Sequence, residues 1–572
     1  MRHIRIIIIS CCLSLCTSIW AQISTNEKPI SFELEAKETK GYDLNIQTVT
    51  MPPLDMDKIQ IEDKEDEEYG IPPRFGYQHK VDYNLTNSGT WQELSNGDKL
   101  WRLNVVCPNA LSINICYDKF WIPDGGKLFV YSKDKSHTIG AFTSRNNKGD
   151  KKNIRGFATG LIYGNDIILE YYQPKEVTDN AIISIEYVVH GYRYINLNMK
   201  SLGDSGNCMV NVNCEEGLDW QKEKKAVALI LVNGNRYCTG SLINTSDLDM
   251  KPYLLTADHC LGDWANHYIK YDAETLPDLD HYSFYWNYEA PGCANTTIEP
   301  LHISTSGATI LANNSYSDFA LLRLSEDPMD LSNYTPYYAG WDCSGFAGDP
   351  GVCIHHPAGD IKKISTVKDV PESCHWISSL QDPNSHWRVT WRATLNGHGS
   401  TQGGSSGSPL FNSEHHVIGQ LHGGHYEECS PNNRSLYGKY SVSWTGNSNN
   451  SIYRRLNCWI DPLNTGIQKI DGLLVVKDII TMNTSEQLNN NIRIANNGQL
   501  NIRGDVELTN NGHIIVDKGG ILIIDGGKLL NTDIELKPGS ILRLINNGFI
   551  KTRNGFEAPT GAIVDMVYGR IL

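Results

Sequence analysis

Residues 254–260 read Leu-Leu-Thr-Ala-Asp-His-Cys, an apolar strand that ends in histidine and cysteine. Residues 317–324, Ser-Asp-Phe-Ala-Leu-Leu-Arg-Leu, place an aspartate before a second apolar strand. Residues 403–409, Gly-Gly-Ser-Ser-Gly-Ser-Pro, form a turn rich in glycine and serine. Each segment alone is a common strand end or turn. Together they supply an imidazole, a carboxylate and a hydroxyl, in that order along the chain.

This set of groups matches the needs of nucleophilic catalysis by serine. A hydroxyl is a poor nucleophile at neutral pH, so it needs an imidazole to take its proton and a carboxylate to orient that imidazole. The candidates are His259 as base, Asp318 as its partner and Ser406 as nucleophile. A tight glycine turn also lets backbone N–H groups point at a developing oxyanion. The backbone groups of Gly404 and Ser406 are the candidates for this oxyanion hole.

The surrounding block, residues 203–472, is rich in short apolar runs separated by Gly-, Asn- and Ser-rich loops. Residues 226–232 and 417–421 are predicted strands. The apolar residues of 451–461 recur at helical spacing before a proline, which predicts that the block ends in one short helix.

Upstream of this block, residues 76–198 alternate short apolar runs with glycine turns, a pattern typical of a β-sandwich. Cys107 and Cys116 lie within it and are expected to be close enough to bridge adjacent strands. Residues 22–75 are polar and contain the acidic run 62–68, which is predicted to be an unpacked leader or linker.

The tail, residues 473–572, contains no cysteine or tryptophan and repeats Asn-Asn-Gly before short aliphatic alternations. Such repeats indicate either the stacked rungs of a β-solenoid or an ordinary sandwich. The turns and aliphatic residues of the tail are expected to form a core of their own. Because the candidate catalytic residues all precede the tail, it is expected to be dispensable for chemistry. Surface attachment or assistance in export are its expected roles.

Length and charge narrow the function classes. A chain of 572 residues is several times the usual domain of about 150 residues, so it divides into several cores. The formal net charge of −15 repels phosphate backbones, which argues against nucleic-acid binding. Proteins or peptides are the expected partners.

The N-terminus predicts export. A basic start, the apolar run 6–15 and small residues ending at Ala21 indicate a secretory signal peptide over residues 1–21. A lipoprotein site at Cys16 is disfavoured because Leu15 precedes it, and no later apolar run is long enough to span a membrane. Outside the signal 12 cysteines remain, an even number that favours disulfides in an oxidising compartment. The predicted location is therefore secreted.

No metal or cofactor is expected. The sequence has no C-x-x-C pair and no H-E-x-x-H motif. His415, His416, His422 and His425 lie close together in the sequence, but they are interpreted as solvated or structural histidines.

With its three catalytic segments and seven further segments, the block 203–472 resembles a chymotrypsin-fold serine endopeptidase. Within that superfamily it most resembles the bacterial lysyl endopeptidases. The resembling segments are Cys238-Thr239-Gly240-Ser241-Leu242, Trp286-Asn287-Tyr288, Ala339-Gly340-Trp341-Asp342, Ile354-His355-His356-Pro357, Gly419-Gln420-Leu421-His422-Gly423-Gly424, Ser443-Trp444-Thr445-Gly446 and Asp461-Pro462 with Thr465-Gly466. The resemblance implies an all-β fold of two antiparallel six-stranded barrels with the triad between them. It also implies that residues 22–202 are a propeptide.

The resemblance implies further residue roles. It pairs Cys208 with Cys429, Cys214 with Cys293 and Cys238 with Cys260, and leaves Cys343, Cys353, Cys374 and Cys458 without assigned partners. It places the indole of Trp376 against the catalytic imidazole, with His422 nearby. The substrate pocket would be lined by Ser400, His422, Gly423, Gly424 and Ser435.

Two positions depart from related enzymes. Animal trypsin-like enzymes carry an aspartate before the nucleophile that pairs with a freed N-terminal amine, whereas this chain has Ser405. Lysyl endopeptidases hold the substrate lysine with an aspartate before a Tyr-Gly pair, and here Ser435 is the nearest residue. A neutral pocket favours a non-basic or broad preference over lysine, unless Glu427 or Glu428 reaches the pocket.

The predicted function is therefore a secreted serine endopeptidase made as a zymogen and cleaved between Lys200 and Gly203. The alternative is a catalytically inactive binding or adhesion protein on the same scaffold.

Overall fold

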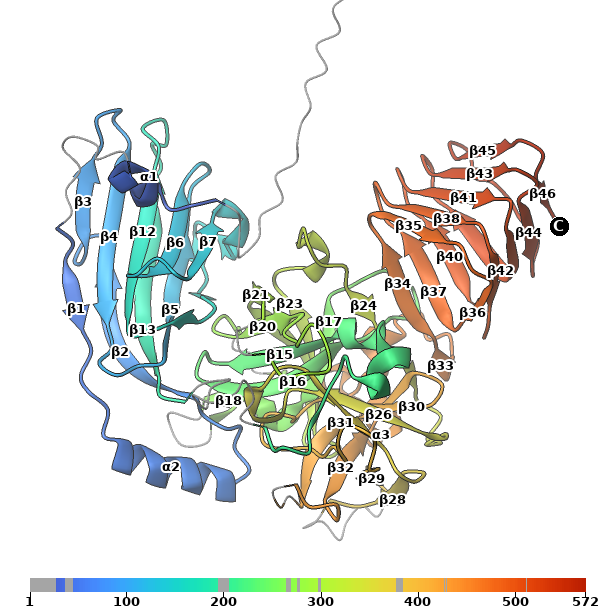
Figure 1. Cartoon of the computed structure of the whole chain (residues 1–572), viewed down its shortest axis with the longest axis horizontal. Helices are drawn as coiled ribbons and strands as arrows, with labels where there is room; N and C mark the ends of the chain where they lie inside the picture. Colours follow the sequence, from blue (N-terminus) through green and yellow to red (C-terminus); the bar gives the residue numbers. More distant parts are fainter. Residues whose placement is uncertain are drawn as a thin grey trace, which may run out of the picture.

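The computed structural model describes residues 27–36, 45–193, 205–263, 269–274, 278–296, 300–376, 384–425, 427, 429–510 and 512–572. The predicted signal peptide, the predicted cleavage segment 200–203 and Glu428 lie outside these ranges. Strands dominate the described chain, as predicted. Two N-terminal sheets, a central part and a C-terminal stack of strands follow one another in Figure 1.

The N-terminal part contains two sheets with a shared core. Leu103, Leu128 and Leu169 from one sheet and Ile115 and Ile185 from the other belong to one buried cluster. The first sheet has the order β1 (Thr48–Thr50), β4 (Lys99–Val106), β12 (Asp166–Gln173), β6 (Lys127–Ser132) and β7 (Thr138–Phe142), with β3 (Thr90–Glu93) on β4. The second has the order β10 (Phe157–Ala158), β5 (Ser112–Trp121), β13 (Ile182–Gly191) and β2 (Gly76–Asn84), with β11 (Ile162–Tyr163) on β5.

Cys107 and Cys116 do not form the expected bridge, and both are buried free thiols. Cys107 belongs to the core between the two sheets. Cys116 lies instead in a separate cluster with Ala158 and Val189. Successive strand residues face opposite sides of a sheet, so residues near one another in sequence need not share a face.

The acidic run does not remain an unpacked linker. It forms most of the helix α2 (Met56–Glu68), whose N-cap Asp55 accepts from the backbone N of Lys58. Only Ile59 is buried among the helix residues. The prediction failed because carboxylates rather than apolar groups attach the helix: Asp63 pairs with Arg74 at 2.9 Å and Asp66 with Arg236 at 2.7 Å.

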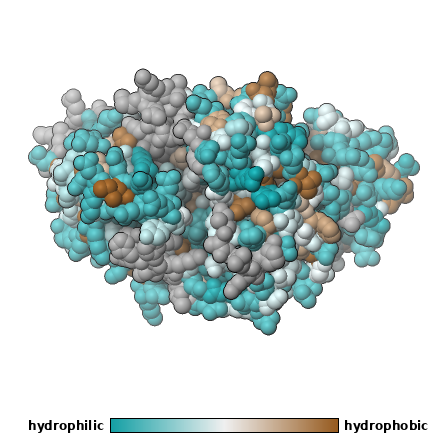
Figure 2. Space-filling view, turned by 90° about the horizontal axis from the view of Figure 1, so that it is seen from below, coloured by the Kyte–Doolittle hydropathy of each residue, from teal (hydrophilic) through white to brown (hydrophobic). Residues whose placement is uncertain are grey.

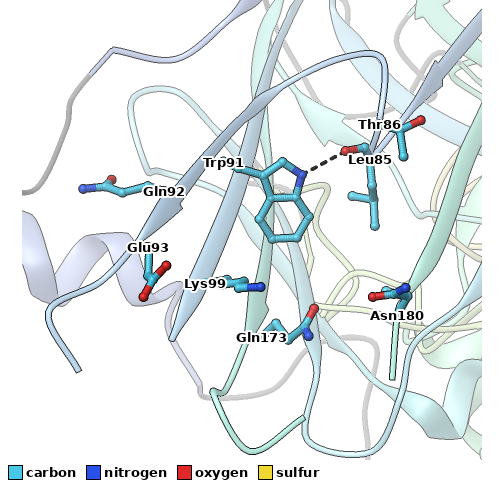
Figure 3. A pocket seen from close by; sticks show the side chains of 9 residues that line it. Leu85, Thr86, Trp91, Gln92, Glu93, Lys99, Gln173 and Asn180 are labelled. Atoms are coloured by element: carbon cyan, nitrogen blue, oxygen red, sulfur yellow. Dashed lines mark hydrogen bonds between the residues drawn. The ribbon is translucent and has the colours of Figure 1, made fainter. Parts of the chain in front are cut away.

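A cavity of about 470 Å³ opens beside β3 in the N-terminal part. Figure 3 shows the indole of Trp91, whose N–H donates to the carbonyl of Leu85 at 2.9 Å, among polar side chains. None of the candidate catalytic residues lines this cavity.

Two sheets build the central part. The first is antiparallel, in the order β21 (Ile303–Ser306), β20 (Ser283–Trp286), β15 (Val227–Val232), β16 (Arg236–Leu242), β17 (Tyr253–Ala257), β23 (Phe319–Leu324) and β22 (Ala308–Asn314). The second has the order β14 (Val210–Asn211), β27 (Lys363–Thr366), β26 (Pro350–His355), β30 (Pro409–Asn412), β31 (His416–His425), β32 (Arg434–Lys439), β29 (His386–Thr390) and β28 (Glu372–Cys374), with β25 (Gly340–Asp342) on β31 and β33 (Lys469–Ile470) on β25.

The end of the central part differs from the single helix predicted for 451–461. The chain forms a 3₁₀ turn, η7 (Ile452–Arg454), and a one-turn helix, α4 (Asn457–Ile460). Arg455 between them has an extended backbone, with φ −148° and ψ 147°. That extended residue divides the segment.

The tail is a β-solenoid, one of the two predicted alternatives. Its strands pair in parallel, with Leu500 opposite Leu522 and Leu522 opposite Leu542, so each rung is about 20 residues long. These three leucines are fully buried in one column. Asn497, Asn510 and Asn547 have positive φ, which asparagine tolerates better than most residues and which explains the Asn-Asn-Gly repeats.

The solenoid has three series of strands. One contains β34 (Gly472–Val476), β37 (Asn490–Ile494), β40 (His513–Val516) and β42 (Lys528–Leu536). The second contains β35 (Ile479–Met482), β38 (Gln499–Ile502), β41 (Ile521–Asp525), β43 (Ile541–Ile545) and β45 (Ile563–Met566). The third contains β36 (Glu486–Leu488), β39 (Asp505–Leu508), the first part of β42, β44 (Phe549–Thr552) and β46 (Arg570–Ile571).

The tail has the core of its own that was expected, but its first strands also pack into the central part. Strand β34 pairs with β24 (Tyr337–Tyr338) of the central part, and Leu473 and Val475 join the central core. Asn490 also donates to the hydroxyl of Tyr337 at 2.7 Å. The solenoid therefore begins as an extension of the central core.

The face of the molecule in Figure 2 is mostly hydrophilic. On the face in Figure 2, apolar side chains occur only in small separate groups. Within the described ranges, no helix has the length and apolar character needed to cross a membrane.

Removing the tail at Gly472 is expected to destabilise the central part. The buried side chains of Leu473 and Val475 each contribute about 1.5–3 kcal/mol of burial free energy. A chain ending at Gly472 should melt several degrees below one ending at Asp478, which keeps β34. Thermal unfolding of the two truncated chains tests this, and equal melting temperatures would contradict it.

Acid is expected to weaken the contact between the N-terminal and central parts. The Nε2 of His281 lies 3.0 Å from the carbonyl O of Tyr117, and burial lowers the pKa of His281. A histidine with a lowered pKa takes up a proton on unfolding, so its contribution is complete above about pH 6.5 and falls at lower pH. His281→Gln should reduce the drop in melting temperature between pH 7.5 and 5.5. The same drop in both proteins would contradict the assignment.

Candidate active site

His259 is the second residue after strand β17, whose five residues are all buried. The strand ends in the 3₁₀ turn η4 (Asp258–Cys260). The Cys238–Cys260 disulfide ties this turn to β16, with 6.3 Å between the two Cα atoms. The histidine backbone is therefore held on both sides, while its side chain remains partly exposed.

Asp318 directs both the turn and the ring of His259. It precedes β23 and has φ 56°, a left-handed conformation in which aspartate is enriched. Its Oδ2 lies 2.7 Å from Nδ1 of His259, and its Oδ1 accepts from the backbone N of the same residue at 2.9 Å. The structure thus brings these two predicted residues together.

Ser406 lies in the loop before β30, next to the turn that carries His259. The carbonyl O of Ser406 accepts from the backbone N of Thr239 at 2.8 Å and lies 3.8 Å from the sulfur of Cys260. The serine itself is partly exposed. The loop that carries the predicted nucleophile is therefore next to the predicted base.

The glycines beside Ser406 are required by close packing. Gly404 has φ 94°, and a Cβ there would lie 3.0 Å from the backbone N of Gly359 and from the carbonyl O of His356. Within the described part of the chain, the N–H groups of Gly404 and Ser406 donate no hydrogen bond. Two unpaired N–H groups in a tight turn are the arrangement that an oxyanion hole needs.

Ser405 has a partner that the sequence analysis did not identify. Its hydroxyl lies 2.8 Å from Nδ1 of His355, and Nε2 of that histidine lies 3.1 Å from the hydroxyl of Ser365. Burial lowers the pKa of His355 to about 3, so the ring is neutral. Ser405 stands where animal trypsin-like enzymes have an aspartate, and here it contacts a buried neutral imidazole. The sequence signal was the Ile354-His355-His356-Pro357 motif.

Trp376 and His422 stack beside the candidate triad. Their ring centroids are 3.5 Å apart with an interplanar angle of 9°. The His422 Nε2 lies 3.7 Å from Oδ2 of Asp318, and its Nδ1 lies 3.0 Å from Nε2 of His386. A Cβ on Gly423 would lie 3.1 Å from the Trp376 ring. His386 is a further neighbour that the sequence analysis missed, because it is distant in the sequence.

The three histidines that lie near His422 in the sequence, His415, His416 and His425, do not form a cluster with it in the structure. The ring of His415 lies against Trp220, with 4.2 Å between ring centroids and an interplanar angle of 31°, and Nε2 of His416 lies 2.8 Å from Oδ1 of Asp471. His425 is exposed. Within the described residues, the group whose ligand atoms lie within 4.8 Å of one another is His259, Asp318 and His422, which shares two residues with the candidate triad.

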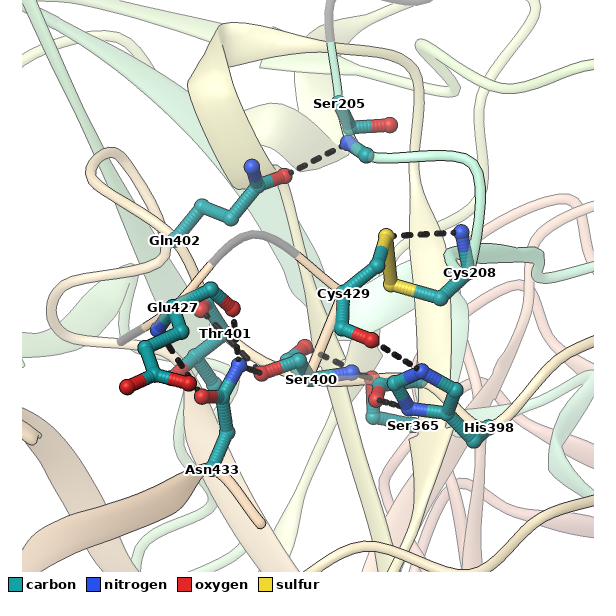
Figure 4. Close-up of a disulfide and its surroundings, with 12 residues drawn as sticks. Ser205, Cys208, Ser365, His398, Ser400, Thr401, Gln402, Glu427, Cys429 and Asn433 are labelled. Atoms are coloured by element: carbon teal, nitrogen blue, oxygen red, sulfur yellow. Dashed lines mark hydrogen bonds between the residues drawn. A yellow bond between two sulfur atoms is a disulfide. The ribbon is translucent and has the colours of Figure 1, made fainter. Parts of the chain in front are cut away.

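Two of the residues predicted to line the substrate pocket, Ser400 and Ser435, contact further hydroxyl and amide groups. The Ser435 and Thr401 hydroxyls lie 2.7 Å apart, and Asn433 donates to the hydroxyl of Ser400 at 2.9 Å. All four residues are buried. Figure 4 shows three of them, with Glu427 beside Asn433. Glu427 is an exposed residue. Its backbone N–H donates to Oδ1 of Asn433 at 2.9 Å.

Three disulfides join the pairs that the resemblance implied. They are Cys208–Cys429, Cys214–Cys293 and Cys238–Cys260. Figure 4 shows the first, which links the chain after the predicted cleavage segment to the loop beside the pocket floor. Cys343, Cys353, Cys374 and Cys458 are free thiols.

Comparison with known protein families matches the part of the chain that contains His259, Asp318 and Ser406. Residues 202–441 match the family model "Lysyl endopeptidase, C-terminal domain". A lysyl endopeptidase of Pseudomonas aeruginosa is 30% identical over 292 residues, which cover 48% of this chain and 57% of that protein. The match thus spans little more than half the length of that relative.

Two solved structures are also similar over part of the chain. The thermostable serine protease AL20 from an extremophilic microorganism is 11% identical, with a TM-score of 0.25, covering 38% of this chain and 92% of its own. A serine endoprotease from Yersinia pestis is 14% identical, with a TM-score of 0.25, covering 40% of this chain and 63% of its own. The family model and the Pseudomonas relative confirm the resemblance that the motifs indicate: the central part of this chain is similar to bacterial lysyl endopeptidases.

Proposed function

We propose that this chain is a secreted serine endopeptidase that is made as a zymogen and acts through His259, Asp318 and Ser406. The observation that carries the proposal is the 2.7 Å contact between Nδ1 of His259 and Oδ2 of Asp318, next to a serine loop with two unpaired N–H groups. Similarity to lysyl endopeptidases over residues 202–441 supports the same assignment.

The proposed reaction follows from the roles of these groups. Ser406 Oγ attacks the peptide carbonyl while Nε2 of His259 takes its proton. Asp318 holds the proton on Nδ1 and stabilises the imidazolium that forms. The N–H groups of Gly404 and Ser406 donate to the oxyanion. His259 then protonates the leaving amine, and water hydrolyses the acyl-enzyme by the same steps in reverse order.

Contacts from the N-terminal part support the zymogen. Tyr237 donates its backbone N–H to the carbonyl O of Pro73 at 3.2 Å. A Cβ on Gly403 would lie 2.6 Å from Cγ of Pro73, so this proline packs against the loop of the candidate nucleophile. Because His355 already holds Ser405, a freed N-terminal amine is not needed at that position. In this proposal, removal of residues 22–202 activates the enzyme by uncovering the loop.

The neutral pocket floor supports a preference for non-basic or varied residues before the cleaved bond. Ser435 and Thr401 are paired through their hydroxyls and Ser400 is bound by Asn433. A lysine ammonium buried there without an anion loses hydration that these hydroxyls replace only in part. This preference distinguishes the chain from the lysine-specific enzymes that its central part resembles.

Ser406→Ala is expected to abolish labelling of the processed protein by a fluorophosphonate probe, because the probe reacts with an activated serine hydroxyl. Ser408→Ala is the matched control, since this nearby hydroxyl is buried against Cys353 and has no part in the proposed reaction. The control should retain labelling. Persistent labelling of Ser406→Ala would overturn the nucleophile, and no labelling of the processed wild-type protein would favour the inactive binding protein.

Ser435→Asp is expected to raise kcat/KM for peptides with lysine before the cleaved bond by tenfold or more. A tenfold change needs only about 1.4 kcal/mol of transition-state stabilisation, which a buried carboxylate facing an ammonium readily supplies. Ser435→Asn has a similar volume without the charge and should show no such gain. Cleavage profiling on a mixed peptide library measures both variants. Wild-type cleavage almost entirely after lysine would contradict the neutral pocket and direct attention to Glu427.

A further inference from the structure

A chain of polar contacts continues from the candidate triad into the second central sheet. Asp318 Oδ2 lies 3.7 Å from Nε2 of His422, whose Nδ1 lies 3.0 Å from Nε2 of His386. The Nδ1 of His386 in turn lies 2.6 Å from the hydroxyl of Ser385. Ser385 and His386 are distant in the sequence from Asp318 and His422. Their position at the start of β29 brings them to the candidate site.

The far end of this chain is inaccessible to solvent. Ser385 is 2% exposed and His386 is fully buried. Burial lowers the pKa of His386 to about 4; Asp318 opposes this change, and Lys439 and His375 add to it. His386 is therefore neutral near neutral pH, with one ring nitrogen that donates a hydrogen bond and one that accepts.

With a neutral His422 ring, two proton arrangements fit these contacts. If Ser385 donates to Nδ1 of His386, then Nε2 of His386 donates to Nδ1 of His422, and the N–H of His422 faces Asp318. If every proton is reversed, the lone pair of His422 faces the Asp318 carboxylate instead. A carboxylate attracts an N–H dipole and repels a lone pair, so the first arrangement is lower in energy.

Neighbouring groups hold the His422 ring in the plane that this arrangement needs. Trp376 stacks on it with 3.5 Å between ring centroids. The ring of His259 lies 5.8 Å away on a near-parallel plane, with an interplanar angle of 24°. The two arrangements place the His422 ring in the same position and differ in its tautomer.

We infer that Ser385 and His386 are positioning residues that hold His422 as the tautomer whose Nε2–H faces Asp318. This inference rests on the proposed function of His259, Asp318 and Ser406. The N–H dipole of His422 helps to keep Oδ2 of Asp318 directed at Nδ1 of His259. The buried Ser385 hydroxyl is linked to His259 through His386, His422 and Asp318. It therefore contributes to the orientation of the catalytic imidazole.

The decisive experiment measures the tautomer directly. Nitrogen NMR of the full chain labelled with ¹⁵N-histidine should show His422 protonated on Nε2, with its signals assigned by comparison with His422→Gln. In Ser385→Ala, His386 Nδ1 loses its donor, and a substantial population of His422 should become protonated on Nδ1. Ser385→Thr retains a hydroxyl and should restore the wild-type tautomer.

Kinetics on the processed protein provide a second measurement. Ser385→Ala should lower kcat about tenfold with little change in KM, and Ser385→Thr should recover most of the loss. The matched control is Ser373→Ala, which removes a hydroxyl from the neighbouring strand β28 that contacts Lys439 rather than His386. This control should retain wild-type kcat.

The outcomes separate this inference from the proposed function. His422 protonated on Nδ1 in the wild-type chain, or an unchanged tautomer in Ser385→Ala, would overturn the inference even if Ser406 is labelled normally. A change of tautomer together with wild-type kcat would also overturn it, because positioning would then have no effect on catalysis. Absent fluorophosphonate labelling in the wild-type protein would instead reject the proposed function.

Discussion

The double contact between Asp318 and His259 is the interaction on which the arrangement of the candidate site depends. One carboxylate oxygen accepts from the histidine backbone and the other faces its ring, while the carbonyl of Asp318 accepts from the backbone N of Asp258. Hydrogen bonds to a charged group contribute about 1.5–3 kcal/mol each. Together they join the end of β17 to the start of β23 and orient the imidazole before any substrate is present.

Buried histidines paired with hydroxyls surround this interaction. His355 lies between Ser405 and Ser365, and His386 lies between Ser385 and His422. Burial lowers the pKa of both rings, so each acts as a neutral donor and acceptor. An uncharged network avoids the desolvation cost of buried ions and still satisfies the polar groups that hold the serine loop and the stacked His422.

The flanking parts of the chain are attached to the central part by different physical means. Helix α2 is attached through ion pairs such as Asp66 with Arg236, which explains how an acidic segment with one buried aliphatic residue is ordered. The solenoid is attached through strand pairing and apolar burial at Leu473 and Val475. The first attachment is sensitive to ionic strength and acid, whereas the second is part of the central core.

The sequence by itself indicated the β-rich class and the candidate triad, because these depend on strand periodicity and on short motifs. Its resemblance to the lysyl endopeptidases implied the three disulfide pairs that the structure contains. The sequence left the tail undecided between a solenoid and a sandwich, since both bury alternating aliphatic residues and differ only in which strand lies opposite Leu522. It allowed a bridge between Cys107 and Cys116 that does not form, because their side chains face different clusters. Only the tertiary structure placed Ser385, His386 and His355 beside the site, because hydrogen bonds between residues distant in the chain are set by strand pairing and leave no local pattern.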